Sequence, residues 1–565
     1  MQRAPIVNLV QRRNVCRTGS LFRRGPGLST TPSLFSERNH AKPLCNNTSG
    51  RRQPSVRAFH TSGDFADYMK QVMSPMTGHV GEQTPSEESN TLREIDRLFT
   101  IISKKACQKS STTHPLVMLG RRSGRWLDDS AAAETTNGGT SSARETRQQR
   151  VEAGTRTMAD SFTIAVLPFS TDRELLEKFK NPNGGLRIGK LLESLDSLAG
   201  TIGYRHCLPP SAFATSTEDG MTGITTASIV KASHDAGLYI ATAAADRIDM
   251  FESLSHPHEI QDIRFSGFVT YTGSSSMEIF VRMEGSGTQP GDEPKTIMLG
   301  RFSIVCRDAE THRAKNCPHL VLNTPEEKAM FAIGEDHKNR KKIASKIALD
   351  KIPPSQGEIN MLHEMMLKVG EREKELEHSG RSGVQALRTS LKEEIVCTRD
   401  TELGNVTLVQ PQDRNLHGKV FGGHLMRLAF ELAYVNAAIF AGRPLRFLAL
   451  DQIIFSRPVP IGAVVRMKAV TVTSTRPKTD EELADGLRTT SAGNAKVHVV
   501  VTAQIQDVAK GSRETTNSFF FSFASENREP LPKLVVPKTY REAMAYIEGA
   551  RRLEVGSALR RHYKS

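Results

Sequence analysis

The sequence repeats one pattern, a glycine-led apolar helix followed by several strand-like segments, and this repetition constrains the fold more than any other feature. The first helix is predicted over 189–204, where leucines, Ala199 and Ile202 recur at helical spacing. The second is predicted to start near Gly422. The strand-like segments alternate and are rich in β-branched and aromatic residues. They cover 263–273, 274–285 and 296–308 after the first helix, and 446–462, 464–475, 495–507 and 516–525 after the second. We therefore expect an α+β fold built by internal duplication of one helix-and-sheet repeat.

Composition and pattern divide the chain into six segments. They are a leader (1–62), a low-complexity and partly disordered lead-in (63–157), a first repeat (158–310), a helical connector (311–390), a second repeat (391–526) and a C-terminal tail (527–565). The lead-in is mostly poor in core-forming residues, and its stretch 128–150 has the composition of a disordered segment. The connector helix has a strong start, because Thr324 caps it, Pro325 takes its first position and Glu327 completes a capping box.

Most of the positive charge lies in the leader. The chain has a net charge of +14, and residues 1–62 hold ten Arg, one Lys and one acid, Glu37, which leaves only +4 for the rest. An Arg-rich, Ser/Thr-rich leader with almost no acids is typical of a mitochondrial transit peptide. Arg57, Phe59 and Ser62 resemble a processing site, so we expect cleavage near 59–62 and residence in the matrix; the alternative is a disordered basic tail. No nucleic-acid partner is expected, because the excess charge is in the leader and no binding signature occurs.

The cysteines and the hydropathy exclude other classes of protein. Seven cysteines are scattered without a Cys-x-x-Cys pair or a regular spacing, so neither a disulfide framework nor a zinc site is expected. No run of about 18 apolar residues occurs, as a membrane-spanning helix would need. The best candidate, 428–442, is too short and contains Glu431 and Asn436.

Seven stretches, taken together and in this order, resemble one known family. They are MADSFTIAVLPF (158–169), RIGKLLESLDSLAG (187–200), IRFSGFVTYTGSSSMEI (263–279), TPEEKAMFAIGE (324–335), NLHGKVFGGHLMRLAFELAYVNAAIFAG (415–442), FSRPVPIG (455–462) and VPKTYREAMAYIEGARR (536–552). From about residue 158 onward the chain resembles the mitochondrial acyl-coenzyme A thioesterases of the acyl-CoA thioesterase 9 type. The resemblance implies tandem hotdog domains, each a long central helix wrapped by an antiparallel sheet, with the two helices side by side and the active site between them. It also implies an acyl-CoA substrate, no cofactor, no metal, and a homo-oligomer, a trimer of double-hotdog chains.

One carboxylate distinguishes the two helices. Seven residues after Gly189 lies Asp196, whereas seven residues after Gly423 lies Phe430. Glu431 is one position further on, about 100° round the helix. Asp196 matches the acid of the family, so the resemblance implies that it is the general base on water, or, less favoured, a nucleophile. Burial among leucines would raise the pKa and the basicity of this carboxylate.

The N-terminus of the second helix is expected to supply the other half of the site. Its unpaired backbone N–H groups near Gly422 and Gly423, together with the positive end of the helix dipole, can bind the oxygen of a thioester carbonyl. Asn415 matches the Asn of the family's loop and can hold the water or the carbonyl. The alternative for Asn415 is an Asx-turn that only closes the loop.

Candidate substrate-binding residues follow from the same resemblance. Ser276 and Met277 match the family's stretch along the pantetheine channel, although a plain sheet strand explains them too. His417 is a further candidate, either as a binding residue or as a hydrogen-bonding residue of its loop. Basic side chains that could take the phosphates of coenzyme A are Arg457, Arg466, Lys468 and Arg476. A solvated surface accounts for these four equally well.

Two other functions remain open at this point. A hotdog enoyl-CoA hydratase uses a D-x-N-x-x-H loop, and the spacing of Asp413, Asn415 and His417 is one residue too short for it. A non-catalytic acyl-CoA-binding sensor is the other possibility, and it would require that the carboxylate of Asp196 takes no part in a reaction.

The repeat also predicts a second, equivalent half-site. Asn181 stands eight residues before Gly189, just as Asn415 stands eight residues before Gly423. Because Phe430 replaces the acid there, we expect one working site per chain, with the second half-site inactive or adapted to a nucleotide. Glu431 would restore it only if the helix were rotated.

Overall fold

The structure, a computed structural model, describes only part of the chain. The described residues are 85–109, 116–118, 154–213, 216–218, 221–223, 226–254, 261–285, 294–346, 348–349, 351–378, 394–415, 417–477, 493–526 and 529–564. The leader 1–62 with its expected cleavage point, and the stretch 128–150, lie outside them.

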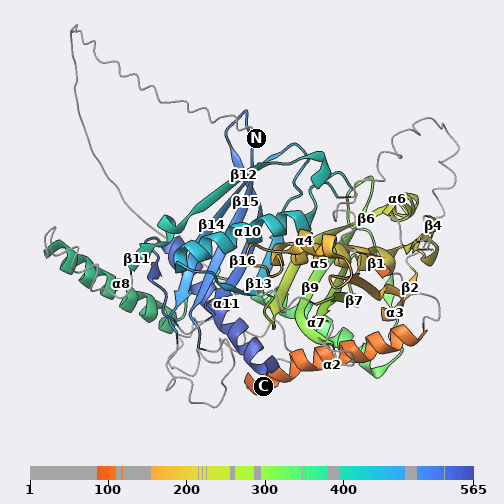
Figure 1. Cartoon of the computed structure of the whole chain (residues 1–565), viewed down its shortest axis with the longest axis horizontal. Helices are drawn as coiled ribbons and strands as arrows, with labels where there is room; N and C mark the ends of the chain where they lie inside the picture. Colours follow the sequence, from red (N-terminus) through yellow and green to blue (C-terminus); the bar gives the residue numbers. More distant parts are fainter. Residues whose placement is uncertain are drawn as a thin grey trace, which may run out of the picture. The chain divides into compact units, whose positions relative to one another are not determined.

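Eleven strands of the described residues form one sheet, in the order β1-β3-β7-β8-β9-β6-β13-β16-β15-β14-β12 (Figure 1). The first repeat supplies β3 (Thr163–Leu167), β6 (Leu238–Met250), β7 (Ile263–Thr272), β8 (Ser276–Gly285) and β9 (Lys295–Asp308). The second supplies β12 (Leu403–Leu408), β13 (Arg446–Phe455), β14 (Val464–Thr475), β15 (Lys496–Gln506) and β16 (Arg513–Ala524). β1 (Leu116–Met118) runs parallel to β3 at one edge, and every other neighbouring pair is antiparallel.

The strand order is symmetric about the pair β6 and β13. Moving outward from this pair, the first repeat places β9, β8, β7 and β3, and the second places the corresponding strands β16, β15, β14 and β12. The two central strands are antiparallel, with Ala449 opposite Asp249 and Ile453 opposite Ala245. The prediction of a duplicated α+β unit, in the tandem hotdog arrangement, is confirmed.

The two long apolar helices, α5 (Ile188–Cys207) and α10 (Gly422–Ala441), pack against the same sheet and against each other (Figure 1). Glycines let the start of each helix reach the middle of the other. A Cβ at Gly189 would lie 3.3 Å from Phe430, and a Cβ at Gly423 would lie 3.0 Å from the carbonyl oxygen of Glu193. The predicted helix 189–204 falls inside α5.

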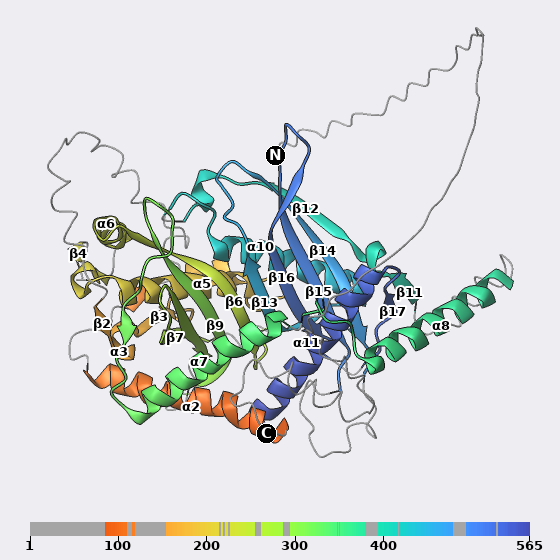
Figure 2. The same cartoon turned by 180° about the vertical axis from the view of Figure 1, so that it is seen from behind.

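Three further helices cover the opposite face of the sheet (Figure 2). They are α2 (Pro85–Lys109), α7 (Pro325–Lys346) and α11 (Tyr540–Lys564). α2 lies in the segment expected to be a low-complexity lead-in, yet it buries Ile95, Phe99 and Ile102 in a core with Phe268 and Phe280 of the sheet. The C-terminal segment expected to be a tail ends in α11, whose Ile547, Leu553 and Leu559 are buried.

The remaining elements are short or lie at the periphery. They are β2 (Thr155–Arg156) with β10 (His319–Leu320), β4 (Ser216–Glu218) with β5 (Met221–Gly223), β11 (Glu394–Cys397) with β17 (Lys533–Val536), α3 (Met158–Ser161), α4 (Arg173–Phe179), α6 (Thr226–Asp235), α8 (Gln356–His378) and the 3-10 turns Pro210–Phe213, Thr398–Thr401 and Pro411–Asp413. None of the helices in the described part of the chain has the combined length and apolarity that crossing a membrane requires.

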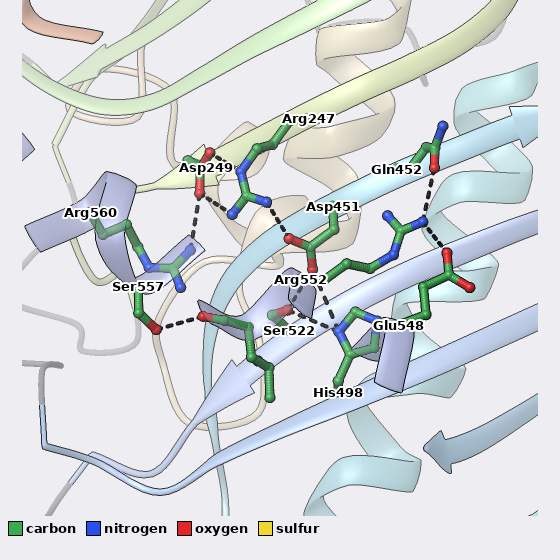
Figure 3. Close-up of polar contacts among 11 residues, drawn as sticks. Arg247, Asp249, Asp451, Gln452, His498, Ser522, Glu548, Arg552, Ser557 and Arg560 are labelled. Atoms are coloured by element: carbon green, nitrogen blue, oxygen red, sulfur yellow. Dashed lines mark hydrogen bonds and ion pairs between the residues drawn. The ribbon is translucent and has the colours of Figure 1, made fainter. Parts of the chain in front are cut away.

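A buried cluster of charges lies where β6 meets β13, under α11 (Figure 3). Arg247 of β6 donates hydrogen bonds to Asp249 on its own strand and to Asp451 of β13, at 2.5–2.8 Å. Arg560 of α11 donates to Asp249 at 3.0 Å. Two cations and two anions therefore balance in a site where each side chain is at most 7% exposed. Gly556 lets α11 come this close, since a Cβ there would lie 2.4 Å from Nη2 of Arg247.

Ser522, His498 and Asp451 lie beside this cluster and are the residue types of a nucleophilic triad, but their hydrogen bonds differ from those of one. The Ser522 hydroxyl donates directly to Asp451, and Nδ1 of His498 lies 3.0 Å from the same hydroxyl (Figure 3). His498 is fully buried, and burial lowers its pKa to about 4, so it is neutral at pH 7. A triad needs the serine proton on the histidine side, so this arrangement is structural.

The charge cluster predicts that α11 holds the two repeats together. Replacement of Arg560 by Met leaves the buried Asp249 with one cation fewer, and breaking a buried pair in this way costs about 3–5 kcal/mol of unfolding free energy. We expect a loss near the lower end, because Arg247 still faces Asp249. Urea unfolding of the variant measures it. The matched control is Arg541→Met, an exposed arginine of the same helix, which should change stability by about 0.5 kcal/mol or less; equal losses in the two variants would contradict the role of the cluster.

Candidate active site

A cavity of about 720 Å³ lies beside α5 and the N-terminus of α10, with walls from both repeats. Five of the residues predicted from the sequence line it: Asp196, Asn415, His417, Gly422 and Arg457. Gly423 is the next residue of α10 and contacts α5. The duplicated fold therefore brings together residues that are more than two hundred positions apart in the chain.

Asp196 lies in the middle of α5 and is only 2% exposed. Burial removes water from its carboxylate and raises its pKa to about 6, from an ordinary value of 3.8, and the nearby Glu193 adds to the rise. Two hydrogen-bond donors lower the pKa of Asp196 and partly offset this rise: the hydroxyl of Thr242, at 3.0 Å, and the backbone N–H of Gly423. The carboxylate is thus held in place by both repeats and is ionised at neutral pH with a raised basicity.

The N-terminus of α10 approaches this carboxylate closely because its first two residues are glycines. A Cβ at Gly422 would lie 3.1 Å from Oδ2 of Asp196 and 3.3 Å from the ring of Phe455. A Cβ at Gly423 would lie 2.6 Å from the ring of Phe421. The N-cap residue, Phe421, offers no side-chain hydrogen bond to the first turn, so the turn keeps backbone N–H groups for other partners.

The loop before α10 is closed by Asn415. Its side-chain oxygen accepts hydrogen bonds from the backbone N–H of His417, at 2.9 Å, and of Lys419, at 3.1 Å. Its backbone N–H donates to the carbonyl of Lys419, and Gly418 adopts a left-handed conformation with φ 67°. Asn415 therefore forms the Asx-type turn that was the alternative interpretation. It also lines the cavity, and its carboxamide NH₂ forms no hydrogen bond to any described residue.

The first repeat contains the same loop at Asn181. The side-chain oxygen of Asn181 accepts from the backbone N–H of Asn183 and of Gly185, at 2.9 and 3.0 Å, and Gly184 has φ 86°. One contact differs: the NH₂ of Asn181 donates to the carbonyl of Leu186, at 3.2 Å. The loop is thus duplicated in detail, but its amide is committed to the fold in the first repeat and available in the second.

Phe430 takes the place of the acid opposite the Asn181 loop. Its ring packs against Phe447, Phe521 and Phe523, with centroids 5.2–6.1 Å apart. Glu431, next to it, forms an ion pair with Arg187 at 2.5 Å instead of turning inward. At this half-site an aromatic cluster occupies the position that a carboxylate holds in the other.

The other predicted residues have varied surroundings. His417 lines the cavity and binds Tyr204 through Nε2, at 2.6 Å. Arg457 lines the cavity at its exposed rim and forms an ion pair with Glu514. Ser276 and Met277 are absent from the cavity wall, and Met277 is buried in the hydrophobic core at 1% exposure. A substrate-binding role for these two stays a prediction without support from the cavity.

Arg466, Lys468 and Arg476 lie away from the cavity wall. Lys468 forms an ion pair with Glu402 at 2.6 Å. Of the four basic candidates, only Arg457 therefore faces the cavity.

Several cavity residues were not predicted. Thr242, Tyr239 and Tyr204 line it from the first repeat, and Arg307 and Lys419 stand at its exposed rim. Thr242 and Tyr239 belong to β6, which the strand pattern did not reveal. Among the lining residues, Arg307, Lys419 and Arg457 carry positive charge and Asp196 is the one acid, so the cavity attracts anions. No group of three or more His, Cys, Asp or Glu residues in the described part of the chain is arranged to hold a metal ion.

The raised pKa predicts that Asp196 destabilises the folded chain. The folded carboxyl has a pKa of about 6 against 3.8 unfolded, so wild-type stability falls as the pH rises through this window, by about 3 kcal/mol in all. Asp196→Asn removes the charge and should be more stable than the wild type by up to about that amount at pH 8, and by little at pH 4. Denaturant unfolding of both proteins at the two pH values measures the difference. The assignment would be contradicted if the stability that Asp196→Asn gains over the wild type were smaller at pH 8 than at pH 4.

Comparison with known proteins gives the family. No family model matches the sequence. The chain is 31% identical over 396 residues to human mitochondrial acyl-coenzyme A thioesterase 9, covering 70% of this chain and 77% of the relative. It is 31% identical over 411 residues to the bovine protein of the same name, covering 72% and 81%.

Among solved structures, an acyl-CoA hydrolase from Staphylococcus aureus shares 23% identity and a TM-score of 0.24, over 28% of this chain and 88% of that one. An acyl-CoA hydrolase from Agrobacterium tumefaciens shares 14% identity and a TM-score of 0.20, over 67% and 99%. The identity and coverage of the two mammalian relatives are decisive: the chain belongs to the family of acyl-coenzyme A thioesterases of the mitochondrial acyl-CoA thioesterase 9 type.

Proposed function

We propose that the chain hydrolyses acyl-CoA thioesters to a free fatty acid and coenzyme A, with Asp196 as the general base. One observation carries the proposal: a buried carboxylate with a raised pKa lies against a glycine-led helix N-terminus in the wall of one cavity. A base acts best when its pKa lies near the working pH, and burial has moved Asp196 toward it. The names of the two mammalian relatives support the same substrate class.

In the proposed reaction Asp196 takes a proton from a water molecule while the oxygen of that water attacks the thioester carbonyl carbon. The negative charge that develops on the carbonyl oxygen needs a donor. The backbone N–H of Gly423 is directed at Asp196, whereas the N–H of Gly422 bonds to no described residue and is free for this oxygen. Removing one such donor costs about 10²–10³ in rate in other hydrolases. The carbon–sulfur bond then breaks, and the leaving thiolate receives the proton that Asp196 holds.

Asn415 is proposed to orient the water or the carbonyl. Its oxygen is committed to the loop, so the available group is its NH₂, which can donate but not accept. The matching amide of Asn181 is bound to Leu186. This difference and the aromatic filling by Phe430 support a single working site per chain.

The rim of the cavity is proposed to bind the phosphates of coenzyme A. Arg307, Lys419 and Arg457 are exposed and positively charged there. Leu425 and Val459 are apolar residues of the same wall and suit the acyl chain. The leader and the names of the relatives support a mitochondrial location, with the matrix as the expected compartment. Assembly as a homo-oligomer, expected to be a trimer, is part of the same proposal.

Hydrolysis and the role of Asp196 are tested together by free-thiol release from acyl-CoA substrates of increasing chain length. Asp196→Asn removes the base while keeping the side-chain shape, and should lower kcat by at least about 10². Asp400→Asn is the matched control, since it makes the same change at an exposed residue outside the cavity. A variant that keeps its rate would sink the assignment of the base. A wild type that hydrolyses no chain length would sink the proposed function and leave the binding sensor.

The pH profile supplies an independent test. The base must be ionised, and its pKa is raised to about 6. The rate kcat/KM should therefore rise with pH through about 6 and level off above 7, and fall tenfold per pH unit well below 6. A profile that levels off below pH 5 would show that the base is a carboxylate with an ordinary pKa.

A further inference from the structure

Tyr204 and His417 meet in the cavity wall, one from each repeat. The hydroxyl of Tyr204, near the end of α5, lies 2.6 Å from Nε2 of His417, in the loop before α10. Both residues line the cavity, and Tyr204 is only 4% exposed. The ring of His417 also packs on Tyr239, with centroids 4.7 Å apart. The pair is therefore a rigid part of the wall.

The pair lies away from the reacting groups. Tyr204 follows Asp196 by eight residues on one helix, a distance of about 12 Å along the axis. On its far side the wall continues to the exposed rim: the hydroxyl of Tyr239 contacts His312 at 3.2 Å, and Arg307 donates to the carbonyl of His312. The pair thus stands between the base and the basic rim, along the path that connects a thioester with the phosphates of its carrier.

The protonation of the pair is defined by its surroundings. Burial lowers the pKa of His417 to about 4, with His312 adding to the effect, so the imidazole is neutral at pH 7. Burial also raises the pKa of Tyr204 well above its usual range, and the backbone N–H of Ile240 is directed at its oxygen. We assign the phenol as the donor to Nε2 of His417, because its oxygen already accepts from Ile240; with this assignment the neutral imidazole carries its own proton on Nδ1. Among the described residues, none accepts a hydrogen bond from that Nδ1–H.

We propose that His417 uses this Nδ1–H to bind the pantetheine arm of the substrate, at the amide carbonyl farther from the sulfur, and that Tyr204 is the positioning residue that fixes the donor. This inference rests on the proposed acyl-CoA substrate. The arm is a neutral chain whose polar groups include two amides, and it joins the thioester to the phosphates. A fixed neutral donor in the wall suits an amide oxygen, whereas the acyl chain prefers the apolar wall and the phosphates are better matched by the cations of the rim.

The first test is binding, because it does not depend on hydrolysis. Calorimetry with coenzyme A and with pantetheine compares the wild type with His417→Leu, which removes the donor, and His417→Asn, whose NH₂ replaces Nδ1–H. We expect His417→Leu to weaken both ligands about tenfold, the worth of one hydrogen bond, and His417→Asn to restore most of the affinity. Unchanged affinity in His417→Leu would overturn the inference even if hydrolysis is intact. A tenfold loss in a chain that hydrolyses nothing would sustain the inference and refute the proposed function.

The second test separates the far amide from the near one. Thioesters of N-acetylcysteamine retain only the amide next to the sulfur, so His417→Leu should raise KM about tenfold for acyl-CoA, with kcat little changed, and alter the truncated substrate less than threefold. Equal losses on both substrates would place His417 at the thioester and overturn the assignment.

Tyr204→Phe tests the positioning role. Without the phenol, the neutral imidazole is no longer held with its proton on Nδ1, so Tyr204→Phe should weaken coenzyme A and pantetheine severalfold when His417 is present, but should weaken them no further in the His417→Leu background. A loss of the same size in both backgrounds would mean that Tyr204 only fills space.

Discussion

The structure depends on the close contact of α5 and α10. Each helix begins with glycines that allow its first turn to lie against the middle of the other, at Gly189 against Phe430 and at Gly423 against Glu193. Two ion pairs also join the elements at this contact, Arg427 with Glu193 and Arg187 with Glu431. A methyl group at Gly423 would press on the ring of Phe421 and on the backbone carbonyl of Glu193, and one at Gly189 would require the side chains of Arg427 and Phe430 to shift. The same contact brings a helix N-terminus to a carboxylate, so the packing that joins the repeats also builds the candidate site.

The duplicated chain contains two equivalent sites, each where the loop before one long helix faces the middle of the other helix. Few side chains distinguish the two sites. Both loops keep the same asparagine turn. At one site Asp196 is buried without a cation beside it, which raises its pKa; at the other Phe430 joins an aromatic cluster. Burying a charge is unfavourable and burying a ring is favourable. The first site thus bears a cost in stability at the carboxylate that we propose as the base, whereas the second gains a packed aromatic cluster.

The sequence predicted those features that depend on spacing within one segment. The duplicated α+β fold could be predicted because its periodicities recur. Asp196, Gly422 and Gly423 were singled out by the resemblance to the family, and the offset from the leading glycine showed which helix carries the acid. Thr242 was not predicted because it lies in β6. This segment is rich in alanine, which is depleted in strands, and its extended conformation depends on pairing with the neighbouring strands. The helix α2 was not predicted because the apolar residues along one of its faces follow a polar segment. Tyr204 could not be assigned to the site, since its partner His417 belongs to the other repeat.

The position of Arg560 has a consequence for the order in which the chain can fold. This residue follows Asp249 by 311 positions in the sequence, yet it donates to that carboxylate on a strand of the first repeat. Tyr563, further on, donates to Asp96 of α2. During synthesis the first repeat can collapse early, but its buried Asp249 has only one of its two facing cations until α11 has been made. Completion of the fold is therefore a late event, and a chain without α11 would leave this carboxylate incompletely compensated.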